Sequence, residues 1–75
     1  MELYYSKSHA DEEGTVDFAK MMLLFGSREE LFKICNFFRI VESHLKKHEN
    51  CHLHLRDNFK NWDSLKDFDI EVNLL

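Results

Sequence analysis

The stretch that decides the fold is MMLLFGSREELFKICNFFRIVESHLKKHENCHLHL, residues 21–55. It begins with an apolar run that stops at Gly26-Ser27. A long amphipathic segment follows over residues 28–48, and apolar and polar side chains then alternate over residues 51–55. Alternation is typical of strands, and three- and four-residue spacing of apolar side chains is typical of helices. The stretch therefore predicts a strand, a capped helix and a second strand.

Ser27 is predicted to cap the helix. Ser27 and Glu30 have the spacing of a capping box, in which the serine hydroxyl accepts the amide of Glu30 and the Glu30 carboxylate reaches back. One helix face, centred near Phe38 and Leu45, is predicted to pack on the sheet. Its apolar residues are Leu31, Ile34, Cys35, Phe38, Val41 and Leu45.

The remaining strands follow from shorter patterns. Residues 2–7 and 15–25 are predicted as a hairpin around the polar, acidic loop 8–14, and residues 68–74 alternate cleanly. We expect one small domain over residues 1–75, of class α+β and order β-β-α-β-β. The economical architecture is one helix packed on a four-stranded, mostly antiparallel sheet.

The charge and the hydrophobic pattern of the chain argue against two classes of partner, nucleic acids and membranes. Ten basic and fourteen acidic residues give a net charge of −4. Nucleic-acid binding relies on lysine and arginine, so we expect no nucleic-acid partner. The longest apolar run is five residues, Met21 to Phe25, which is far short of the roughly 20 that a membrane span needs. We expect no membrane association and a cytoplasmic location.

No catalytic motif is present, and we expect no enzyme activity. Cys35 and Cys51 both occupy positions expected to face the core, where a cysteine behaves as a small hydrophobic residue. Gly26 stands alone, so a phosphate-cradling loop is not indicated.

Histidines are frequent, with five in 75 residues. His44 and His48 are four residues apart on one helix face, and His52 and His54 share one strand face. Their spacing matches no established zinc signature, so we expect neither a resident metal nor any other cofactor. A metal-responsive protein that uses these four histidines remains an alternative.

Two surfaces are candidates for binding a protein. Acidic residues cluster near the C-terminus, around a loop that holds Trp62, and acidic patches attract basic partners; they are Asp57, Asp63, Asp67, Asp69 and Glu71. On the helix, Ile40 lies off the predicted core face, and Phe37 lies at its edge, near His44. These three residues either form an exposed strip that binds a partner, or they are covered by the sheet or by the Trp62 loop.

The segment LLFGSREEL, residues 23–31, together with His52-Leu53-His54-Leu55, resembles the small α+β immunity proteins of bacterial polymorphic toxin systems. The resemblance is to the immunity protein thirty-two family and covers roughly residues 18–75. It implies a non-enzymatic inhibitor that occludes a cognate toxin, often a basic nuclease, with no catalytic residues. The acidic cluster would speed association with such a toxin, and Trp62 would be an anchor. A small adaptor domain that homodimerises through a sheet edge is the alternative, so both monomer and homodimer stay open.

Overall fold

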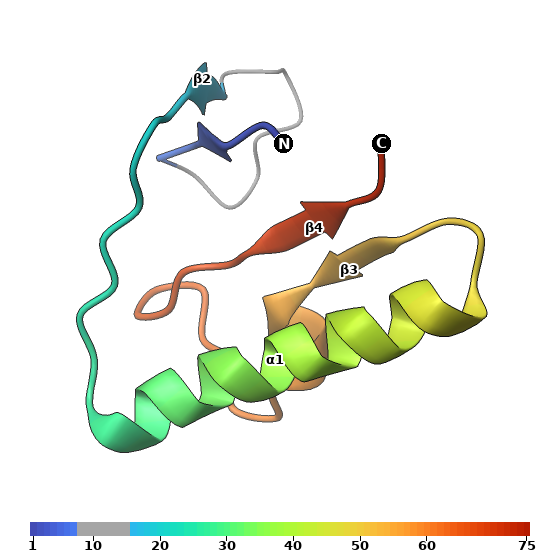
Figure 1. Ribbon diagram of the computed structural model, residues 1–75. Helices are drawn as coiled ribbons and strands as arrows, with labels where there is room; N and C mark the ends of the chain where they lie inside the picture. The colour runs from blue at the N-terminus through green and yellow to red at the C-terminus, as the bar shows by residue number, and fades with distance from the viewer. Residues whose placement is uncertain (8–15) are drawn as a thin grey trace.

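The computed structural model describes residues 1–7 and 16–75. Its elements are β1 (Tyr4–Tyr5), β2 (Asp17–Phe18), α1 (Arg28–Lys47), β3 (His52–His54), a short 3-10 turn (Leu55–Asn58) and β4 (Glu71–Asn73). The α+β class and the element order are those predicted (Figure 1). The predicted loop 8–14, which contains the acidic run Asp11-Glu12-Glu13, lies outside the described residues, as does Thr15.

The strands form two small antiparallel sheets, so the prediction of one four-stranded sheet is wrong. β1 pairs only with β2, and β3 pairs only with β4, among the residues that the structure describes. In the second sheet, His52 lies opposite Asn73, Leu53 opposite Val72 and His54 opposite Glu71. Two backbone hydrogen bonds, from Leu55 to Ile70 and from Leu74 to Cys51, continue this ladder at both ends.

The predicted strand 15–25 is mostly not a strand. Only Asp17–Phe18 pairs with β1, and residues 19–27 run as an extended connection to the start of α1 (Figure 1). A central strand that is apolar on both faces needs cover on both sides. One helix cannot supply that cover, and Met21, Met22, Leu23 and Phe25 are exposed.

α1 begins where the sequence predicts. The Ser27 hydroxyl accepts a hydrogen bond from the Glu30 amide, and the Glu30 carboxylate accepts one from the Ser27 amide. These bonds lower the pKa of the Glu30 carboxyl. A Cβ at Gly26 would lie 3.3 Å from the Glu30 Cβ, so glycine there leaves room for Glu30 to fold back over the helix end.

The core lies between α1 and the β3–β4 sheet. Its fully buried residues are Phe37, Val41, Cys51 and Leu55, and the partly buried residues around them are Ile34, Leu53, Phe59, Ile70 and Val72. Leu53 and Val72 face the helix, so alternation places the polar side chains of β3 and β4 on the opposite face of the sheet.

The helix face that packs on the sheet differs from the predicted one. Phe37 has no exposed surface, whereas Phe38 is 43% exposed and Leu45 is 42% exposed. The helix is apolar over a wide arc, and the sheet contacts the stripe through Ile34, Phe37 and Val41. Cys35 is exposed rather than buried, while Cys51 is buried as expected.

Candidate functional site

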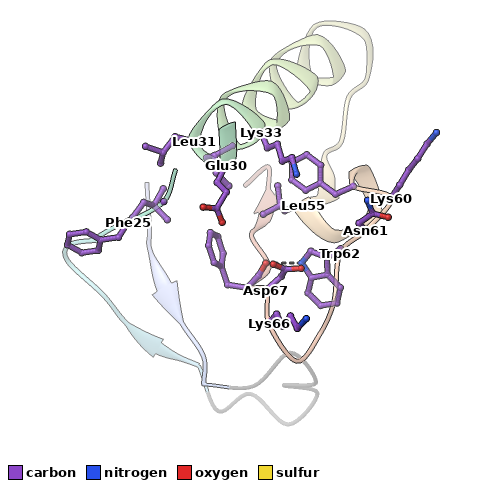
Figure 2. A pocket seen from close by; sticks show the side chains of 15 residues that line it. Phe25, Glu30, Leu31, Lys33, Leu55, Lys60, Asn61, Trp62, Lys66 and Asp67 are labelled. Carbon is purple, nitrogen blue, oxygen red and sulfur yellow. Dashed lines mark hydrogen bonds between the residues drawn. The ribbon is translucent and has the colours of Figure 1, made fainter. Parts of the chain in front are cut away.

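An apolar groove of about 510 Å³ lies between the first half of α1 and the loop that precedes β4. We call it the helix–loop groove. Its apolar lining consists of Leu24, Phe25, Leu31, Ile34, Leu55, Phe59, Trp62 and Phe68, and its charged lining of Glu30, Lys33, Lys60, Lys66 and Asp67. Figure 2 shows Phe25 and Trp62 on opposite sides of the groove.

Trp62 holds the loop wall of this groove in place. Its indole Nε1 donates to the Phe68 carbonyl oxygen over 2.9 Å. Asp63 and Asp67 tighten the same loop, because the Asp67 carboxylate accepts the Asp63 amide at 2.7 Å and the Asp63 carboxylate accepts the Leu65 amide at 2.9 Å. The loop therefore carries its own polar contacts and presents Trp62 at a fixed position.

The five predicted acidic residues do not form one patch of equivalent charges. Asp63 and Asp67 support the loop, whereas the Asp57 side chain is 70% exposed and lies 4.0 Å from the Arg56 guanidinium. Asp69 is turned inward, with a side chain only 13% exposed. Glu71 lies beside the histidines of β3.

Asp69 is the most constrained of these acids. Partial burial raises the pKa of its carboxyl, but this effect is outweighed by the Arg56 amide at 3.0 Å, by the His54 ring at 2.6 Å and by the positive charge of Arg56. The net result is a pKa below the ordinary aspartate value. Asp69 thus remains ionised and ties β3 and its following turn to the segment before β4.

The predicted helix strip is only partly exposed. Phe37 lies in the core, which contradicts its place in the strip, and Ile40 is exposed as expected. His44 is half-buried, and its Nδ1 has no hydrogen-bond partner among the described residues. The His44 and His48 rings stack with centroids 4.2 Å apart.

The four candidate histidines separate into two pairs with different surroundings. His44 and His48 stack on the helix. His52 and His54 join Glu71 on the outer face of the β3–β4 sheet, where one nitrogen or oxygen from each residue lies within 4.8 Å of the others. In the part of the chain that the structure describes, this is the group whose side chains could hold a metal ion.

Sequence reasoning missed that side chains of β4 and of the segment before it contact the histidines of β3. Asp69, Glu71 and Asn73 have the spacing of two that places them on one strand face, as do His52 and His54. If residues 51–55 and 68–74 had been predicted as neighbouring strands, these residues would have been placed beside His52 and His54. Asp69 and Glu71 instead entered the prediction as acids that attract a partner.

Comparison of the chain with known protein families, with curated proteins and with solved structures gives no match. The relation to toxin immunity proteins therefore stays a prediction. Within the described residues, no helix combines the length and the hydropathy needed to cross a bilayer.

Proposed function

We propose that this chain is a non-enzymatic protein-binding domain that neutralises a cognate bacterial toxin by covering its surface. The proposal that the chain binds a protein rests on the exposed apolar surface beside the helix–loop groove. Phe25 in the groove lining is 92% exposed, and Leu65 at the tip of the loop is 93% exposed. Apolar surface rimmed by charged side chains is typical of protein interaction sites.

The open shape of the chain supports the same proposal. Its radius of gyration is 13.0 Å, above the about 11 Å typical of a globular chain of this length. Residues 19–27 and the β1–β2 sheet leave Phe18, Met21, Met22 and Leu23 exposed. A partner that covers this surface would supply the apolar burial that the small core lacks.

Charge indicates which kind of protein would bind. The chain carries fourteen acidic and ten basic residues, and a negative field speeds encounter with a basic partner. A basic nuclease toxin fits this charge, and it is the partner that the family resemblance implies. Asp57 is the exposed acid that would contribute most, since Asp63, Asp67 and Asp69 also hold the fold together and Glu71 lies 3.2 Å from His54.

Affinity capture from the source organism, followed by an activity assay, tests the proposal. The captured protein should bind in a one-to-one complex, carry a basic surface and lose its toxic or nuclease activity when mixed with this chain. Phe25→Ala should weaken the complex by about 1–2 kcal/mol, because it removes an aromatic side chain that the partner would cover. A partner whose activity is unchanged in the complex would contradict the proposal.

Phe32→Ala is the matched control. Phe32 lies in the first half of α1 and is 59% exposed, but it does not line the helix–loop groove. Its truncation should leave binding unchanged, which separates loss of the groove contact from a general loss of apolar surface.

A homodimer that forms through a sheet edge is the second candidate. β4 has a strand partner on one side only, so its outer edge offers unpaired backbone groups, within the described residues. This function predicts a molar mass that doubles with concentration in the absence of any other protein.

A further inference from the structure

The outer face of the β3–β4 sheet carries a convergent group of polar side chains, none of which lines the helix–loop groove. His52 and His54 project from β3 on this face, and the strand register places Asn73 and Glu71 directly opposite them. The His54 side chain is only 15% exposed. Polar side chains on a solvated surface usually point into water. The close packing of two imidazoles with a carboxylate therefore calls for a specific explanation.

Hydrogen bonds fix the orientation of both imidazole rings. His54 Nδ1 lies 2.6 Å from the Asp69 carboxylate, and His52 Nδ1 lies 2.5 Å from the Asn73 side-chain oxygen. An ionised carboxylate and an amide oxygen only accept hydrogen bonds, so Nδ1 carries the proton in each ring. In the neutral rings, the Nε2 lone pairs are therefore free.

The two Nε2 atoms lie close together at the same end of the cluster. The Nε2 atoms are 3.2 Å apart, and His54 Nε2 is also 3.2 Å from Glu71 Oε1. Zinc bonds of about 2.0–2.1 Å in tetrahedral geometry separate ligand atoms by about 3.3 Å. Two of the three separations in this group therefore match a zinc ligand set, and the third lies within 4.8 Å.

Electron-rich atoms this close together are stabilised by a positive charge between them. A proton on His54 Nε2 can satisfy one neighbour at a time, whereas a divalent cation satisfies all three atoms together. The surrounding bonds also match a metal site, because histidine ligands are commonly oriented by a carboxylate or carbonyl on the second ring nitrogen. Asn73 additionally donates to the second Glu71 oxygen over 2.8 Å.

We propose that His52 Nε2, His54 Nε2 and Glu71 bind one Zn²⁺ ion, with Asp69 and Asn73 as positioning residues. Two imidazoles and one carboxylate are a ligand set that zinc takes in proteins. Ferrous iron takes the same three ligands, so the titration compares the two ions. A fourth position is left for water. Because the ligands come from both strands, the ion fastens β4 to β3 and holds the C-terminal segment on the core (Figure 1).

The test is titration of the full-length, tag-free chain with ZnCl₂ and, separately, with a ferrous salt, followed by calorimetry and by the absorption of Co²⁺ as a spectroscopic substitute. We expect one zinc ion per chain, tighter binding of zinc than of ferrous iron, and a tetrahedral Co²⁺ spectrum. His54→Ala and Glu71→Gln should each weaken zinc binding by at least 100-fold, and Asn73→Ala by about 10–100-fold, as the loss of a positioning residue does. Zinc should also raise the melting temperature.

His44→Ala combined with His48→Ala is the matched control, since it removes two histidines from the stacked helix pair. This variant should bind zinc like the natural chain. The proposal would be overturned if the chain bound several ions weakly and the helix variant reduced this binding as much as Glu71→Gln does. A Co²⁺ spectrum that Glu71→Gln leaves unchanged would also overturn the proposal. Glu71 is exposed, so we expect this variant to fold, and circular dichroism checks that it does. Neither result depends on toxin binding.

Discussion

Phe37 is the residue on which the fold depends most. Among the described residues it is the one with no exposed surface, and it packs with Val41 of α1 and with Cys51 and Leu55 beyond the helix. A chain of this size has a total stability of about 4–11 kcal/mol. A single aromatic side chain is therefore a large part of what separates the folded from the unfolded state.

Phe37→Ala should lower the free energy of unfolding by about 3–5 kcal/mol, because it leaves a cavity at the centre of a small core. Urea denaturation followed by circular dichroism measures the change. Phe38→Ala is the control, since Phe38 is a neighbour of the same type that is 43% exposed. Equal losses in the two variants would mean that the buried helix face is not the one described.

Asp69 should make stability depend on pH in the acid range. Its folded-state pKa lies below its unfolded value of about 3.9. Its contribution is therefore fully present above that value and is lost as the pH falls through the folded pKa. The gap in unfolding free energy between the natural chain and Asp69→Asn should be widest at neutral pH and should close at acid pH.

Urea denaturation at several pH values in the presence of a chelator measures this gap without any contribution from metal. Asp57→Asn is the control, because the Asp57 side chain is 70% exposed. Its difference from the natural chain should be small at every pH. An Asp69→Asn gap that stays constant down to acid pH would show that the Asp69 carboxylate does not hold the strand ends together.

Among the elements, α1 shows how far local sequence determines structure. Its start at Ser27 was predictable because capping is decided by residues three positions apart. Its buried face was not, because two neighbouring stripes, one through Phe37 and one through Phe38, are both apolar. Only the strands that pack against the helix decide between them, and that information is distant in sequence.

Ser27→Ala should lower the free energy of unfolding by about 1 kcal/mol, since it removes the side-chain acceptor of the Glu30 amide. Ser43→Ala is the matched control, because Ser43 is an exposed residue inside the same helix. Alanine favours helix interiors, so this control should be neutral or slightly stabilising. A Ser27→Ala variant as stable as the natural chain would show that the capping box contributes nothing.

The strands were harder to predict than the helix. Alternation in residues 51–55 and 68–74 correctly indicated a strand in each run and a core-facing side for Leu53, Ile70 and Val72. It did not indicate that the two strands pair, and Phe68 and Leu74, which were predicted to face the core, are exposed. The run Met21 to Phe25 was misleading, because an apolar run does not reveal whether its cover comes from the same chain. The histidine cluster was missed as a group because it requires the register between two strands, which neither strand contains alone.

At the scale of the whole molecule, the two proposals use two different surfaces. The β3–β4 sheet presents its apolar face to α1 and its histidines to the outside. The helix–loop groove lies between the start of α1 and the Trp62 loop, and no residue of the histidine cluster lines it. A zinc ion on the first surface would secure β4, while a toxin on the second would cover Phe25 and the loop.

The most direct measurement is affinity capture with the natural chain and with Phe25→Ala, followed by an assay of the captured protein's toxicity. The account predicts one basic partner in a one-to-one complex, inhibited by the natural chain and bound about ten-fold more weakly by the variant. Recovery of this chain alone as a dimer, or of a partner that stays fully active in the complex, would contradict it.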